Sequence, residues 1–170
     1  MPKPIKLYVR WVDAVNRVIG RCMMYMIFVL MGILLFSSIS RGVFDVSYIW
    51  SVEMAQFMLT AYYILGGGYS MQIHSHVRMD LFYSRWSPRT QALADALTSG
   101  FLIFYLVWLL VGGISGTMYA IQYNQKNYSS WAPPLAPIKV IMCIGITLML
   151  LQVVAVFFRD VANARGKPLE

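Results

Sequence analysis

Charged residues are scarce in this sequence. Lys, Arg, Asp and Glu make up 12% of its 170 residues, whereas 59% are hydrophobic and 15% are aromatic. About a quarter of the residues of a soluble domain are normally charged. This composition excludes a soluble fold and predicts an all-α integral membrane protein.

Long apolar runs occupy most of the chain. They lie at about 22–40, 48–73, 97–121 and 138–158, and each reaches the ~20 residues that a helix needs to cross ~30 Å of hydrocarbon. Ser87-Pro88 is typical of an N-cap followed by proline at the first helical position. A helix from Pro88 to Gln122 would be about 50 Å long and would have to tilt or project.

We therefore predict a single membrane domain over residues 1–170 with four long, tilted transmembrane helices at about 22–40, 48–73, 91–121 and 138–158. An amphipathic helix is predicted before the first span, because Ile5, Val9 and Val12 recur at helical spacing. Lys6 and Arg10 lie on other faces. This helix fits a membrane-surface anchor, with partner docking as the alternative.

The interiors of the predicted spans contain no Asp, Glu, Lys, Arg or His. Pumps, ion-coupled carriers and voltage sensors need such groups at membrane depth. Intramembrane proteases need a nucleophile and base, or paired Asp residues, inside the bilayer. The chain alone therefore shows no transport pathway, and we predict no catalytic residues and no enzyme activity.

Acidic residues are fewer than basic ones, seven against fourteen, which gives a formal charge of +7. With a cytoplasmic N-terminus and four spans, all basic residues except Arg41, Lys126 and Lys139 fall on the inner side. This is the positive-inside asymmetry. It predicts cytoplasmic termini and contact with anionic lipid, and no binding of nucleic acid.

Metal-ligating residues are scarce too. Cys22 and Cys143 lie at opposite membrane faces in this topology, which excludes a disulfide between them. His74 and His76 are two residues apart and share no helix face, with Asp80 as the nearby carboxylate. Neither histidine lies deep enough for a membrane haem. We predict no metal or cofactor, and interfacial contacts for both histidines.

Glycines mark two helix faces. Gly66, Gly67 and Gly68 lie in the second span, where they favour close helix packing, with local unwinding at a binding site as the alternative. Gly112 and Gly116 form a GxxxG pair in the third span, which is typical of a helix-packing face.

Three charges lie at the outer ends of the spans. Glu53, in the first turn of the second span, suits the helix dipole, and Arg41 is able to pair with it. Lys139 opposes the dipole of the last span and fits a side chain that snorkels outward. For all three, the alternative is contact with an extracytoplasmic partner.

Glu53 followed by GGGYSMQIHSHVRMDLF at 66–82 resembles the signature of a transporter subunit. The resemblance is to the small membrane subunit of TRAP (tripartite ATP-independent periplasmic) transporters, the DctQ type. The family core His-x-Arg-x-Asp-Leu is matched by His76, Arg78, Asp80 and Leu81. Further matches are Ser87-Pro88-Arg89, Trp131, Pro137, Lys139, Gly145 and Gln152. Gln72 departs from the family, which often has Arg there.

This resemblance implies an accessory subunit in the bacterial inner membrane. Its partners would be a large elevator-type membrane subunit and a periplasmic substrate-binding protein, and the complex would import organic acids by sodium symport. The substrate class would be C4-dicarboxylates or sialic acid, and overall likeness favours sialic acid or a similar carboxylated compound. The small subunit would brace the large one and help dock the binding protein.

We accordingly predict partner contacts at His76, Arg78 and Asp80 on the cytoplasmic side, and at Arg41, Glu53 and Lys139 on the periplasmic side. Two other functions stay open. One is a self-standing oligomeric channel or exporter that uses Glu53 as its ion-binding carboxylate. The other is a membrane redox subunit or enzyme built on His74 and His76.

Overall fold

The computed structural model describes residues 3–73 and 88–164, which form four α-helices. These are α1 (Lys3–Phe44), α2 (Ile49–Gln72), α4 (Pro88–Gln122) and α5 (Ala136–Ala164). These ranges contain no strand, and an isolated bridge joins Lys126 to Pro134 in the α4–α5 loop. The all-helical prediction is confirmed, and α4 begins three residues before and ends one residue after the span predicted at about 91–121.

α1 is one uninterrupted helix of 42 residues. It is about 63 Å long, roughly twice the thickness of the hydrocarbon core. The sequence predicted a separate amphipathic helix before a span at 22–40, but the structure joins the two. No proline follows Pro4 in this segment, and Gly20 continues the helix while it admits the ring of Tyr69 at close range.

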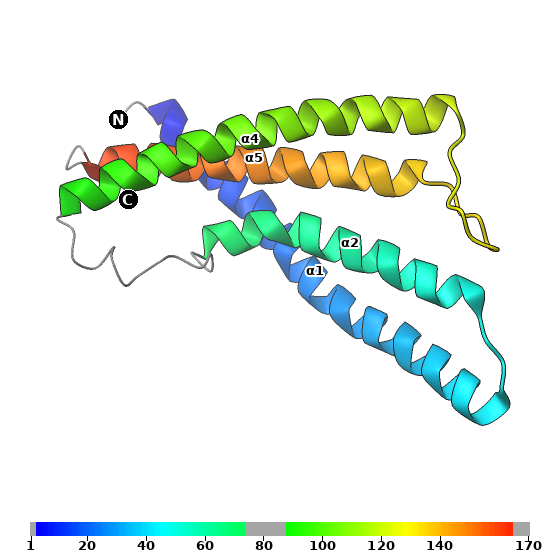
Figure 1. Ribbon diagram of the computed structural model, residues 1–170. Coiled ribbons are helices and arrows are strands. Elements are labelled where there is room, and N and C mark those ends of the chain that lie inside the picture. The colour runs from blue at the N-terminus through cyan, green and yellow to red at the C-terminus, as the bar shows by residue number, and fades with distance from the viewer. Residues whose placement is uncertain (1–2, 74–87, 165–170) are drawn as a thin grey trace.

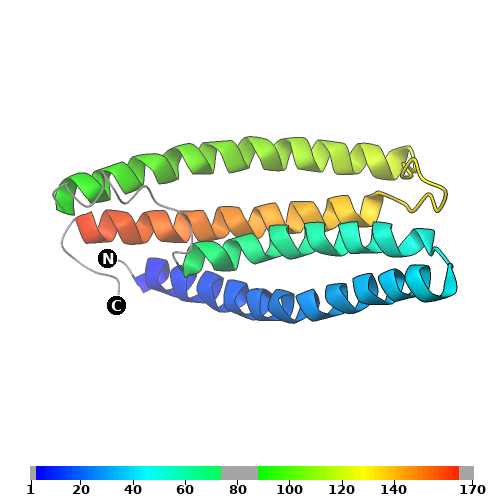
Figure 2. The same cartoon turned by 60° about the horizontal axis from the view of Figure 1, so that its bottom comes forward.

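The helices form two antiparallel hairpins, α1–α2 and α4–α5, that meet along α5 (Figures 1 and 2). α5 packs against α4, α2 and α1. In Figure 1 the first half of α1 crosses close to α5, and its second half diverges together with the start of α2. The loops at 45–48 and 123–135 therefore share one end of the molecule, which we call the outer end.

The core is thin and divided into two clusters. One contains Met71, Leu106, Ile146 and Val153, and the other contains Val9, Val12 and Ala155. Many large apolar side chains point outward instead, with Phe28, Tyr63, Phe101, Trp108 and Met118 each more than 60% exposed. Such broad apolar faces suit lipid or other membrane helices and not water.

Three helical segments are long and apolar enough to cross a membrane: Ile5–Phe44, Leu97–Gln122 and Ala136–Arg159. The 24 residues of α2 give a length of about 36 Å, which suffices for a crossing. Its glycines, tyrosines and glutamines make it less apolar, but α2 packs on both α1 and α5 and needs less lipid-facing surface. Three crossings are thus supported, and the fourth stays a prediction.

Candidate functional site

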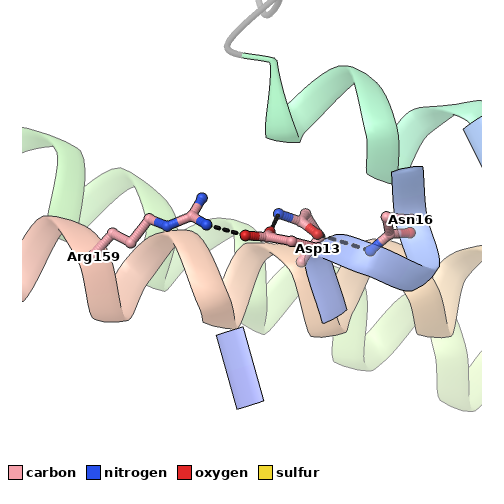
Figure 3. Close-up of polar contacts among 4 residues, drawn as sticks. Asp13, Asn16 and Arg159 are labelled. Carbon is pink, nitrogen blue, oxygen red and sulfur yellow. Dashed lines mark hydrogen bonds and ion pairs between the residues drawn. The ribbon is translucent and has the colours of Figure 1, made fainter. Parts of the chain in front are cut away.

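A buried chain of polar side chains links the first half of α1 to α5 (Figure 3). Arg159 forms an ion pair with Asp13. Gln152 donates from Nε2 to Asp13 Oδ1 at 2.9 Å, and Asn16 donates from Nδ2 to Gln152 Oε1 at 2.8 Å. Gln152 and Asn16 are 0% and 1% exposed. We call these four residues the α1–α5 polar cluster.

The carboxylate of Asp13 fixes the direction of the donors in this cluster. Because an ionised carboxylate only accepts hydrogen bonds, Gln152 must turn its Nε2 to Asp13 and its Oε1 to Asn16. Asn16 then presents Nδ2 to Gln152, so its Oδ1 faces Gly68 of α2, where no described residue donates a hydrogen bond to it. The cluster therefore sets the register of α1 on α5, since sliding either helix would leave buried polar groups unpaired.

The sequence analysis noted Gln152 only through the family resemblance and missed the rest of the cluster. A signal was present in α1, because Asp13 and Asn16 are three residues apart and share a helix face. Val9 and Val12, which are buried against α5, lie next to this polar pair. A polar pair on an apolar helix face, together with one Gln in an apolar span, indicates such a contact.

The predicted packing glycines behave differently from one another. A Cβ on Gly67 would lie 2.9 Å from Met149 Sδ, and one on Gly68 would lie 2.5 Å from Asn16 Oδ1. Gly66, Gly112 and Gly116 have no such neighbour within 4 Å in the described chain. Gly67 and Gly68 thus lie at close helix contacts, whereas the other three face open space.

The outer end holds two of the predicted partner residues. Arg41 is exposed and donates to Ser47 Oγ at 3.3 Å, so the structure does not pair it with Glu53. Ser37 and Ser51 share a hydrogen bond of 2.8 Å between α1 and α2. Glu53 is 7% exposed, and its Oε2 has no hydrogen-bond partner among the described residues. Glu53 is therefore a buried carboxylate near the start of α2.

Lys139 bonds within the chain. Its Nζ donates to Gly116 O at 3.2 Å and to Gln125 Oε1 at 2.9 Å, and the side chain is half-buried. These bonds tie the start of α5 to the end of α4 and the loop between them. Acceptors within the chain therefore bind the ammonium group, and whether the side chain also snorkels outward stays a prediction.

The predicted cytoplasmic residues His76, Arg78 and Asp80, together with His74, lie outside the described residues. Among the residues that the structure describes, no group of three His, Cys, Asp or Glu side chains is placed to hold a metal ion. Cys22 and Cys143 are free thiols. The polar groups that the structure brings together therefore lie at contacts between helices and at the outer end.

These features define a class of protein: a small helical membrane protein whose described polar groups mostly join its own helices and whose outward faces are apolar. The chain belongs to the DctQ family, since the family model described as Tripartite ATP-independent periplasmic transporters, DctQ component, matches residues 30–163. It is thus a small membrane subunit of a TRAP transporter, as the resemblance at His76, Arg78, Asp80 and Leu81 predicted. The comparison with curated proteins found no match.

Proposed function

We propose that the chain is the scaffold subunit of a sodium-coupled TRAP importer of organic acids of the C4-dicarboxylate or sialic acid class. It would brace a large elevator-type membrane subunit and help dock a periplasmic substrate-binding protein. The ions and the substrate would be held by the large subunit. In this proposal the chain lies in the bacterial inner membrane with four crossings and cytoplasmic termini.

One observation carries the proposal: several polar residues of the described helices, such as Asp13, Asn16 and Gln152, bind within the chain, and broad outward faces are apolar. Asp13 binds both Arg159 and Gln152, and Lys139 binds α4 and its loop. What remains outside is apolar surface with the open glycines Gly112 and Gly116. This surface suits lateral packing against other membrane helices.

The cytoplasmic contacts of this complex are proposed from the sequence alone. We assign His76, Arg78 and Asp80 to the turn that fixes how the helical pairs sit against the large subunit. Asp80→Ala should therefore reduce complex assembly or transport without altering substrate selectivity. A change of selectivity in an intact complex would contradict this assignment.

On the periplasmic side we propose that Arg41, Glu53 and Lys139 shape the surface that meets a partner. Arg41 is the exposed member of the three, whereas Glu53 is buried near the start of α2 and Lys139 binds Gln125 in the α4–α5 loop. Arg41→Ala should weaken transport at limiting binding protein more than at saturating binding protein. Equal loss at both concentrations would count against a docking role for Arg41.

Co-purification tests the scaffold assignment. The full chain should be expressed with the large permease subunit from a neighbouring reading frame and isolated through a tag on one of the two. A stable one-to-one complex is expected. If the tagged chain elutes alone and the permease transports without it, the scaffold proposal is wrong.

The rival function is a self-standing channel or exporter that uses Glu53. Glu53 Oε2 is buried and has no donor among the described residues, which keeps this alternative open. Ion or substrate flux through vesicles that contain this chain alone would favour the channel, and Glu53→Gln should then abolish that flux.

A further inference from the structure

The first half of α1 turns one side to α5 and leaves the other side exposed. On the packed side, Val9 and Val12 form a buried cluster with Ala155 of α5, and Asp13 and Asn16 belong to the α1–α5 polar cluster. These contacts fix the rotation of α1 about its axis, so they also determine which residues lie on the far side. We call this far side the α1 basic face, and its exposed members are Leu7, Arg10, Trp11, Arg17, Val18 and Arg21.

The α1 basic face is amphipathic in its own right. Its members recur every three or four positions or at sums of these spacings, so they follow one line along the helix. The three apolar members, Leu7, Trp11 and Val18, are 71%, 61% and 63% exposed. Because successive residues are rotated by about 100°, these apolar side chains lie along one edge of the face and the three arginines along the other.

The described chain does not neutralise these arginines. Asp13 is the only acidic residue of α1, and it is paired with Arg159 on the packed side. Within the part of the chain that the structure describes, no hydrogen bond or ion pair joins Arg10, Arg17 or Arg21 to another residue. The face therefore carries three positive charges that are available to anions from outside.

The face lies where α1 leaves the hydrocarbon core. An upright helix that crosses ~30 Å of hydrocarbon from Phe44 reaches the other side near Met24. Arg21 follows within one turn of that level, and Arg10 lies about 17 Å further along the axis. α1 runs obliquely to α4 and α5 (Figure 1), and an oblique helix stays in the headgroup layer for more of its length. The arginines therefore begin at the level of the lipid phosphates.

We propose that the α1 basic face binds anionic phospholipids of the phosphatidylglycerol class in the inner leaflet. Arg17 and Arg21 are one helical turn apart, so both guanidinium groups reach one phosphate, which accepts hydrogen bonds from them. Arg10 lies about 10 Å from Arg17 along the axis and binds a second headgroup. Trp11 lies at the headgroup boundary, where Trp is enriched in membrane proteins. Net charge predicted contact with anionic lipid without a location, and this face supplies one.

The composition of the face favours a lipid over water or an acidic protein segment. A solvated face would account for the arginines but not for the exposed apolar edge beside them. An anionic lipid carries a phosphate and acyl chains in one molecule, which matches both edges. The apolar edge also continues into the spanning part of α1, where Tyr25 and Phe28 are 68% and 66% exposed. The inference rests on the membrane placement proposed above and not on the identity of the partners.

The first test uses the unaltered full chain and varies the lipid. The protein is purified in detergent, stripped of lipid, and titrated with phosphatidylglycerol or phosphatidylcholine of the same acyl chains, with bound lipid counted by native mass spectrometry. Both lipids carry a phosphate, but the choline group of phosphatidylcholine offsets its charge. A preference of roughly twentyfold for phosphatidylglycerol is expected, because each of two arginines beside an anionic lipid contributes about a factor of five.

The second test uses matched pairs of exposed cations. Arg17→Gln combined with Arg21→Gln should reduce the preference for phosphatidylglycerol to below about fivefold, because Arg10 alone remains on the face. Arg41→Gln combined with Lys126→Gln is the control, because both residues are exposed at the outer end and the net charge falls by the same amount. This control should keep the preference of the unaltered chain. Gln is a good helix former, so both variants should retain α1.

Four results would overturn the proposal. The first two are equal binding of the two lipids by the unaltered chain and a preference that survives the loss of Arg17 and Arg21. The third is an equal loss of preference in both pairs, which would make it a property of net charge and not of this face. The fourth is release of bound phosphatidylglycerol when the large subunit is co-expressed, which would assign the face to a protein contact. Since the titration uses this chain alone, failure to form a transporter complex is a separate outcome.

Discussion

At the residue scale, polar side chains of the described helices are used at a few defined contacts. Gln152 bridges a charged residue and an amide, with Asp13 on one side and Asn16 on the other. Its two hydrogen bonds lie between α1 and α5 in the thin core, where few apolar contacts back them up. Removal of one side chain here thus unpairs several buried groups at once.

Gln152→Leu should lower the free energy of unfolding by about 2 kcal/mol, since it leaves the buried Asn16 amide and one Asp13 oxygen without partners. Denaturation of the full chain in detergent measures this loss. Gln56→Leu is the matched control, because Gln56 is exposed on α2. Equal stability of the two variants would show that the α1–α5 polar cluster does not set the register.

Lys139→Met should release the α4–α5 loop. Loss of the bonds to Gly116 O and Gln125 Oε1 should cost about 1 kcal/mol of local stability, which appears as roughly five- to tenfold faster amide exchange at Gln125 and Leu135. Lys126→Met is the comparison, because Lys126 is exposed in the same loop. If both variants exchange alike, Lys139 does not hold the loop.

At the scale of elements, α2 depends on glycine at particular positions. Successive helix positions are rotated by about 100°, so three consecutive glycines face three directions. Gly67 meets Met149 of α5 and Gly68 meets Asn16 of α1, whereas Gly66 faces open space. α2 therefore packs closely against α5 at Gly67 and against α1 at Gly68, and is open at Gly66.

Gly68→Ala should destabilise the chain by about 1–3 kcal/mol, because the added methyl group overlaps Asn16 and forces the helices apart. Gly66→Ala has room and should be neutral or stabilising by up to about 1 kcal/mol through helix propensity. Thermal unfolding of both variants in one detergent tests the pair. A stable Gly68→Ala variant would contradict the close contact of α1 with α2.

The sequence predicted the elements better than it predicted their contacts. Apolar runs are local, so the presence and approximate extent of α4 could be predicted from residues a few positions apart. The polar cluster could not, because its hydrogen bonds join residues separated by 136 and 139 positions. The packing of α1 at Gly20 could not be predicted for a similar reason. The Tyr69 ring that fills the space beside Gly20 comes from α2, 49 positions further along the chain.

At the scale of the whole molecule, the open glycines of α4 mark the face that we expect to meet the large subunit. Gly112→Leu and Gly116→Leu fill space that no described residue occupies. Each should leave the thermal stability of the isolated chain unchanged or raise it by up to about 1 kcal/mol through helix propensity, and each should reduce co-purification with the large subunit. Gly32→Leu on α1, which is equally open, is the control.

A loss of complex with Gly32→Leu alone would move the interface from α4 to α1. If all three variants assemble normally, the apolar faces at these glycines meet lipid and not the large subunit.

We assign this chain a role that includes no transport pathway of its own. Uptake by proteoliposomes tests this assignment most directly. Proteoliposomes would hold this chain alone, the large subunit alone, or both, with the binding protein outside and a sodium gradient imposed. The account predicts uptake of an organic acid when both subunits are present, and none with this chain alone. Substrate-specific, gradient-driven uptake by this chain alone would contradict it.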